Sequence, residues 1–195
     1  MLTLTRTAIF SAVLAVLTGC SSAFNLDAAQ RLENQNDYEG ALKQYTDLAK
    51  EKPNLVEAFT GKARCLQKLD RAKEAEDALR EAVHVGPTNV SAKVDLGNIL
   101  ENRKNLVEAK IQFDEAYLVD SKSVPVIEGQ AKVMEDNGDS KGALDKYKEA
   151  IAIDPSNIDL HEKLAHTYGI LNDFENAKKE LAEVDKIKLQ PKPKS

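Results

Sequence analysis

The sequence predicts an all-α fold, an array of five copies of one two-helix unit. Alanine recurs at one unvarying interval from Ala41 to Ala177, and similar small and large apolar residues recur around it. Trp is absent and aromatic residues make up 5% of the chain, which argues against a sheet protein built on clusters of large rings. Hydrophobic residues at 42% and charged residues at 30% are typical of a globular protein. A chain of 195 residues suits one domain or one short repeat array.

Residues 1–19 differ from the rest of the chain. One charge, Arg6, precedes an apolar run from Ala8 to Leu17. This run is too short to cross a bilayer, which needs about 20 apolar residues, and the combination is typical of a secretory signal peptide. Leu17-Thr18-Gly19-Cys20 then resembles the bacterial lipobox. The resemblance implies cleavage before Cys20 and acylation of its thiol. The alternative is an uncleaved apolar N-terminus in which Cys20 is incidental.

Residues 20–24 are the expected link between the lipid anchor and the first helix. A link of this length reaches at most roughly 17–18 Å, so the repeats should lie close to the membrane. In the resembled lipoproteins, a serine such as Ser21 after the cysteine favours sorting to the outer membrane. The expected location is therefore the periplasmic face of the outer membrane.

Five repeats follow between residues 25 and 189, with expected boundaries near 22–55, 56–89, 90–123, 124–157 and 158–191. Each copy has a small residue in its first helix: Ala29, Ala63, Gly97, Ala131 and Ala165. The recurring alanine comes next, at the start of the second helix: Ala41, Ala75, Ala109, Ala143 and Ala177. A large apolar residue follows one turn later: Tyr45, Leu79, Phe113, Tyr147 and Leu181. Small residues on both helices let the backbones approach, and the large residue fills the space to the next copy.

Turn residues separate the two helices of each copy: Asn36-Asp37, Asp70-Arg71, Lys104-Asn105, Gly138-Asp139 and Asn172-Asp173. Pro53, Pro87 and Pro155 are expected to end second helices, because helix is disfavoured at the residue before proline. Ser121 and Leu189 stand at the equivalent positions of the other two copies.

This pattern resembles the tetratricopeptide repeat (TPR), whose period of about 34 residues equals the interval between the recurring alanines. The resemblance implies an α-solenoid of five helix–turn–helix repeats in a right-handed superhelix, with first helices lining a concave groove that binds a protein or an extended peptide. In that family the groove is lined by the second, fifth, ninth, twelfth and thirteenth residues of each repeat. The predicted groove residues here are Thr60, Arg64, Gln67, Lys68, Val94, Asn98, Glu101, Asn102, Glu128, Lys132, Glu135 and Asp136. Asn98 and Asn102 lie one turn apart, where they could bond a peptide backbone. The alternative is a merely solvated face.

The sequence predicts no catalytic site, metal site or cofactor. Gly138 to Gly142 matches the G-x-S-x-G motif, but it falls on a helix–helix turn, whereas a nucleophile elbow follows a strand. His161 and His166 lie about 140° apart around a helix and do not suit one metal ion. Cys65 is predicted to be a small buried residue. The net charge of −5 offers no basic field for nucleic acid.

The C-terminal helix carries an apolar stripe of Leu181, Val184 and Ile187. One interpretation is that the stripe packs inward on the fifth repeat. The other is that part of it stays exposed and docks on a partner or on a second copy. Residues 190–195 are predicted to be a short basic tail.

These resemblances imply a non-enzymatic scaffold anchored in the membrane. Similar short TPR lipoproteins serve pilus and secretion systems, as pilotins or as Flp/Tad-type assembly factors, and that role is expected here. Others assist outer-membrane protein assembly or recruit peptidoglycan hydrolases, and both remain alternatives. An enzyme or a small-ligand receptor is the distant alternative, which a deep pocket with converging ionisable groups would favour.

Overall fold

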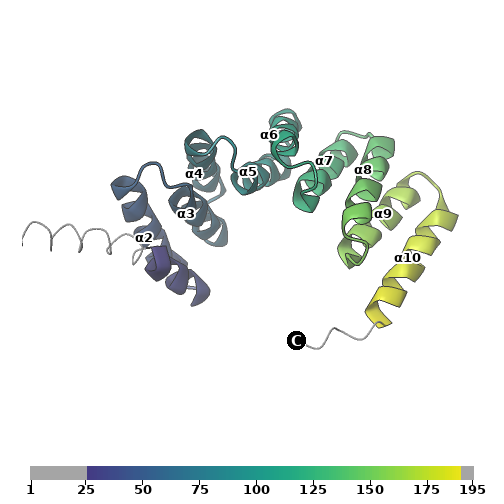
Figure 1. Cartoon of the computed structure of the whole chain (residues 1–195), viewed down its shortest axis with the longest axis horizontal. Helices are drawn as coiled ribbons and strands as arrows, with labels where there is room; N and C mark the ends of the chain where they lie inside the picture. The colour runs from purple at the N-terminus through teal and green to yellow at the C-terminus, as the bar shows by residue number, and fades with distance from the viewer. Residues whose placement is uncertain (1–25, 190–195) are drawn as a thin grey trace, which may run out of the picture. The chain divides into compact units, whose positions relative to one another are not determined.

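The computed structural model describes residues 26–189 of the chain. The predicted signal peptide, Cys20, the link at 20–24 and the tail at 190–195 lie outside the described residues. Within residues 26–189 all regular secondary structure is α-helical, which confirms the predicted fold class. The chain divides into two compact units after Pro87, and each unit consists of helical hairpins (Figure 1).

The first unit holds two hairpins. Residues 26–34 are helical and precede α2 (Tyr38–Glu51). The second hairpin consists of α3 (Val56–Lys68) and α4 (Ala72–Val85), and α3 also packs against α2.

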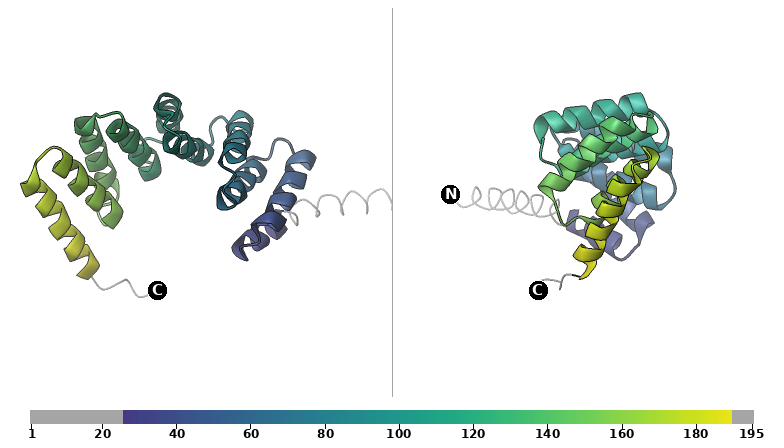
Figure 2. Two further views of the ribbon diagram at one scale, coloured as in Figure 1. Left: turned by 180° about the vertical axis from the view of Figure 1, so that it is seen from behind. Right: turned by 90° about the vertical axis from the view of Figure 1, so that its right-hand side faces the viewer.

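The second unit holds three hairpins. They are α5 (Val90–Asn102) with α6 (Leu106–Val119), α7 (Val124–Asp136) with α8 (Ser140–Ile153), and α9 (Ile158–Ile170) with α10 (Phe174–Leu189). The two helices of a hairpin run antiparallel, as α9 and α10 do at the yellow end of the chain in Figure 2. Consecutive hairpins are joined by packing of α6 on α7 and of α8 on α9.

One residue with a left-handed backbone lies in the turn of every hairpin. These residues recur at the repeat interval and have φ angles between 57° and 82°: Asn36, Asp70, Lys104, Gly138 and Asn172. The next residue caps the second helix in several copies. Asp37, for example, accepts a hydrogen bond from the Gly40 amide at 3.0 Å. The turns therefore occur where the sequence places them, for the expected chemical reason.

Proline is not required to end a second helix. The helices α2, α4 and α8 end two residues before a proline, but α6 ends at the equivalent residue, Val119, without one. There, the Asp120 carboxylate accepts a hydrogen bond from the Lys122 amide at 3.0 Å. This local side-chain bond competes with helix continuation and ends α6. The last helix, α10, has Leu189 in place of these prolines and continues to that residue, two residues before Pro191.

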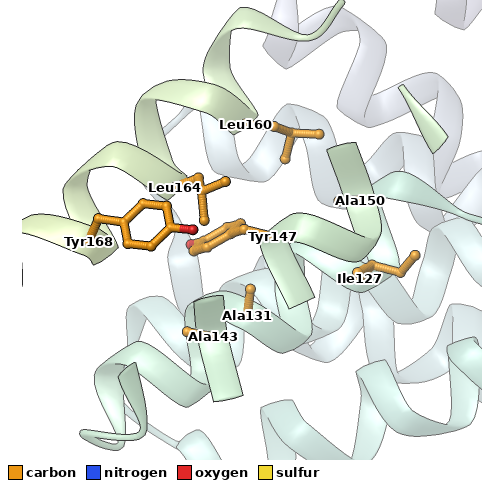
Figure 3. Packing of buried hydrophobic residues seen from close by; sticks show 8 residues of the cluster. All are labelled: Ile127, Ala131, Ala143, Tyr147, Ala150, Leu160, Leu164 and Tyr168. Carbon is orange, nitrogen blue, oxygen red and sulfur yellow. The ribbon is translucent and has the colours of Figure 1, made fainter. Parts of the chain in front are cut away.

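The core lies within and between the hairpins. Tyr147 of α8 is 1% exposed and packs among Ile127 and Ala131 of α7 and Leu160 and Leu164 of α9 (Figure 3). The large residue of the second helix therefore fills the space to the next hairpin, as predicted. Leu181, its counterpart on α10, is 50% exposed, because no further hairpin follows α10 within the described residues.

Candidate partner-binding groove

A groove of about 220 Å³ crosses three successive first helices of the second unit, α5, α7 and α9. It is lined by Val94, Asn98, Pro125, Glu128, Gly129, Lys132 and Lys163. Four of these belong to the predicted groove: Val94, Asn98, Glu128 and Lys132. The family positions therefore bring side chains from different repeats to one surface.

Three lining residues are not among those predicted from the sequence. Pro125 is the second residue of its repeat, which is one of the family's groove positions, so the same mapping could have found it. Gly129 and Lys163 are sixth residues, which the mapping does not include. Gly129 lies there because α7 passes over the Phe113 ring: a Cβ atom at this position would stand 2.2 Å from Phe113 Cε1. Only the tertiary packing makes this position part of the groove.

The groove's lysines are already paired with acidic residues. Lys132 Nζ lies 2.5 Å from Glu101 Oε2, and Lys163 bonds Glu128 and Asp159. Burial alone would lower the pKa of Lys163, but Asp159 and Glu128 outweigh it and the pKa is raised. These contacts fix α5, α7 and α9 to one another, and since three carboxylates face two ammonium groups, neither lysine is an unpaired cation.

Glu101 does not line an open groove. Glu101 is 3% exposed, and its carboxylate forms an ion pair with Lys132. Lys104 Nζ lies 3.9 Å from Glu101 Oε1. A hydrogen bond with Glu101, and then the Lys104 ammonium, hold the pKa of Asp136 below its ordinary value against the effect of burial. The prediction of Glu101 as a partner-contacting residue needs correction: its side chain connects hairpins, because a buried carboxylate requires cationic partners.

Glu135 has a similar structural role. Its carboxylate accepts hydrogen bonds from Thr167 Oγ1 at 2.5 Å and from the Tyr147 hydroxyl at 3.0 Å. It therefore links α7 to α8 and α9. Both Glu101 and Glu135 are twelfth residues of their repeats.

Two neutral amides remain available in the second unit. Asn98 and Asn102 are exposed on α5, and among residues 26–189 no protein group hydrogen-bonds their side-chain amides. An amide offers both donors and an acceptor, so this pair could bond an extended peptide backbone.

The remaining predicted groove residues lie on α3 of the first unit. Arg64 Nε and Nη2 donate to the two Glu33 oxygens at 2.7 and 3.0 Å, so of the two predicted groove cations on α3 only Lys68 is exposed outside this ion pair. Thr60 Oγ1 donates to the Glu57 carbonyl at 3.3 Å. Gln67 is exposed.

A larger cavity of about 450 Å³ lies between α8, α9 and α10. Three lysines, Lys148, Lys179 and Lys186, surround an apolar floor that includes Ile151 and Leu164. Its acids are engaged: Glu180 Oε2 lies 2.7 Å from His161 Nδ1, and Glu183 pairs with Lys186 at 2.7 Å.

The cavity exists because Ile151 is smaller than its counterpart one repeat earlier. That counterpart, Tyr117, donates its hydroxyl to Glu149 at 2.8 Å, and Lys146 Nζ lies 4.4 Å from its ring centroid. The cavity therefore follows from a change in side-chain size, while its acidic groups are held by neighbouring bases.

The motifs considered for chemistry have structural roles. Ser140 is the first residue of α8, and the element before its turn is the helix α7. A nucleophile elbow requires a strand at that place. Cys65 is fully buried, and burial raises the pKa of its thiol to about 11. No cluster of three metal-ligating side chains occurs in the described part of the chain.

The predicted stripe on α10 is only partly exposed. Val184 is 3% exposed and packs inward, as the first interpretation expects, so it is not available for docking, whereas Leu181 is half exposed, as the second interpretation requires. None of the helices within 26–189 has the length and hydropathy that a membrane span requires.

Comparison with known proteins places these hairpins in a family. Models described as tetratricopeptide repeat match residues 26–89, 66–125 and 158–191, and one described as TPR repeat matches 136–170. A barley protein (Hordeum vulgare) named probable UDP-N-acetylglucosamine–peptide N-acetylglucosaminyltransferase SPINDLY is 30% identical over 156 residues. That match covers 76% of this chain but only 16% of the barley protein.

Solved structures share the fold at low sequence identity. MamA from Desulfovibrio magneticus RS-1 has a TM-score of 0.78 and 15% identity, covering 88% of this chain and 97% of its own. The pilF protein of Pseudomonas aeruginosa has a TM-score of 0.77 and 14% identity, covering 87% and 78%. YrrB, titled a TPR protein with an unusual peptide-binding site, has a TM-score of 0.67 and 20% identity, covering 84% of each chain. From its repeats and these matches, the chain belongs to the tetratricopeptide repeat family.

Proposed function

We propose that this protein is a lipid-anchored adaptor that binds an extended segment of another protein in the groove over α5, α7 and α9. The groove is the main support for this proposal, because three repeats contribute to it and its lysines form ion pairs with acidic residues of the same protein. Asn98 and Asn102, by contrast, keep their amides unpaired within the described residues. A ligand with many backbone amide groups and little net charge suits such a surface.

The proposed setting is the assembly of a pilus or a secretion system at the periplasmic face of the outer membrane. The lipobox-like Leu17-Thr18-Gly19-Cys20 supports anchoring. The likeness in fold to the Pseudomonas pilF protein supports the pilus assignment only at the level of fold.

Photo-crosslinking in intact cells tests the groove. A photoreactive residue at Asn98 of the full chain should capture a protein that the same residue at Lys141 on α8 does not. The double variant Asn98→Ala, Asn102→Ala should reduce capture several-fold, while the matched surface variant Lys141→Ala, Asp145→Ala should not. Equal capture by both variants would show that the groove is not the binding surface.

The captured protein also identifies the pathway. A pilus or secretin component supports the proposed setting, whereas a barrel-assembly protein or a peptidoglycan hydrolase would replace it with one of the alternatives. Anchoring is tested separately by metabolic labelling with palmitate, where Cys20→Ser should lose the label and the membrane association of the parent chain.

A further inference from the structure

The helix α6 exposes an aliphatic stripe that no other repeat has within the described residues. Val107 is 77% exposed, Ile111 48% and Leu118 86%. Because a helix turns about 100° per residue, these three side chains project within about 40° of one another. The stripe shares no residue with the groove proposed above.

The other repeats serve as internal controls for this stripe. At the three equivalent positions, α8 carries Lys141, Asp145 and Ala152, and α10 carries Glu175, Lys179 and Lys186. In the first unit, α2 carries Glu39, Lys43 and Lys50, and α4 carries Lys73, Asp77 and His84. The fold therefore does not require apolar residues at these positions, and their exposure on α6 needs another explanation.

The stripe has the spacing of a helix-pairing seam. The seam consists of Val107, Ile111, Asp114 and Leu118. Successive members are separated by four, three and four residues, which is the a/d spacing of a heptad pattern. In an antiparallel pair with a two-fold axis between residues 112 and 113, Leu118 faces Val107 of the other copy. Ile111 then faces Asp114 of the other copy.

The charges of this surface complement each other across the same axis. The Asp114 carboxylate accepts hydrogen bonds from Gln130 Nε2 at 2.7 Å and from Lys110 Nζ at 2.5 Å, so its position on α6 is fixed. The two-fold operation places Lys110 of each copy on the same flank of the seam as Asp114 of the other copy, while Glu115 lies on the opposite flank. Lys110 of each chain therefore lies where it can pair with Asp114 of the second copy, twice across the axis.

We propose that α6 is a self-association surface, on which a second copy of this chain pairs its own α6 in antiparallel orientation. Such an interface is isologous and closes as a dimer. One pair of helices about 21 Å long buries less than the roughly 800 Å² per partner of standard stable interfaces. We therefore expect a weak dimer whose population rises with concentration.

Cysteine crosslinking of the full chain tests the orientation. The double variant Val107→Cys, Leu118→Cys should form a covalent dimer under mild oxidation, because the thiol at position 107 of one copy faces the thiol at position 118 of the other. Either single variant alone should not, since equal positions lie about 16 Å apart along the helix axis at each end. Mixing the two single variants should restore the crosslink. The parent chain measures any contribution from Cys20 and Cys65.

The matched control places the same pair on α8, as Lys141→Cys with Ala152→Cys. A crosslink no stronger in the α6 double variant than in this control or in the parent would overturn the proposal. Crosslinking of the single variants alone would equally overturn it, since that result indicates a parallel arrangement.

A second measurement does not depend on thiol chemistry. The triple variant Val107→Lys, Ile111→Asp, Leu118→Ala gives α6 the residues of α8 and should fold with unchanged helical circular dichroism. Sedimentation equilibrium should show its dimer dissociation constant weakened by more than about tenfold. A parent chain that stays monomeric, or a triple variant that dimerises as well as the parent, would exclude self-association through α6 and leave a different partner for this surface.

Discussion

Arg64 and Glu33 form a two-point ion pair between first helices of successive hairpins, with Nε–Oε1 and Nη2–Oε2 distances of 2.7 and 3.0 Å. The same sequence separation recurs between Glu101 and Lys132 in the second unit. The acids are twelfth residues and the bases ninth residues of their repeats. The sequence predicted Arg64, Glu101 and Lys132 to contact a partner. Their ion pairs instead connect adjacent repeats in both units.

The variant Arg64→Met should lower stability at neutral pH by about 1 kcal/mol, because this ion pair is bidentate but about half exposed. Hydrogen bonds from Arg64 lower the pKa of Glu33, burial opposes this, and a bond from Tyr45 adds to it. A lowered folded-state pKa gives stability that is complete above the unfolded pKa of about 4.3 and is lost as pH falls through the folded value. Thermal unfolding should show the largest difference between parent and variant above about pH 5. A difference that is unchanged at pH 3 would contradict this account.

The variant Gly129→Ala should destabilise the second unit by about 1–3 kcal/mol. The new methyl group would meet the Phe113 ring, which also lies against Gly97, so the ring has little room to move. Chemical denaturation measures the loss. Leu79 stands at the position equivalent to Phe113 one repeat earlier. In a Phe113→Leu background, Gly129→Ala should therefore lower the free energy of unfolding by less.

Gly169→Ala is the matched control for this prediction. Nothing lies within 4 Å of a Cβ atom at Gly169 on α9, so alanine there should stabilise by about 0.5–1 kcal/mol through helix propensity alone. Similar effects of both alanines would show that Phe113 does not distinguish the two positions.

Removing Glu115 should cost more stability than removing its partner Lys93. Lys93 is 3% exposed and bonds Glu115, whose side chain is half exposed. Glu115→Ala leaves a buried ammonium unpaired and should destabilise by about 2–3 kcal/mol, whereas Lys93→Met should be neutral or slightly stabilising. Urea unfolding of the double variant should recover most of the loss. A double variant as unstable as Glu115→Ala would refute this interpretation.

The variant Ile151→Tyr should raise the melting temperature by filling the cavity between α8, α9 and α10. The ring would occupy the space that Tyr117 fills one repeat earlier, with Glu183 in the place of Glu149. Burying the ring should stabilise by about 1 kcal/mol, measured by calorimetry. Ile151→Val, which enlarges the cavity, should move the melting temperature in the opposite direction.

Period and turn chemistry made the helices predictable from sequence. The constant repeat interval and the small–small–large pattern define hairpins because each residue type acts locally, through helix propensity, capping and close packing of neighbouring helices. Asn36 and Gly138, for example, mark turns whose left-handed backbone favours those residue types. The sequence likewise predicted Tyr147 to be buried from the repeat pattern, and Cys65 from its place beside Ala63 and Leu66 on a first helix.

The groove depended on contacts between residues in successive repeats, which the sequence does not express as a local pattern. Glu101 and Asn98 look equally suited to meet a partner, yet Lys132 binds Glu101 and buries it while Asn98 stays free among the described residues. Gly129 enters the groove only because of the Phe113 ring beneath it. The sequence by itself determined the repeated hairpin, since local interactions specify it. The tertiary structure decided which polar side chains stabilise the array and which remain for binding, because ion pairing between repeats competes with binding for the same groups.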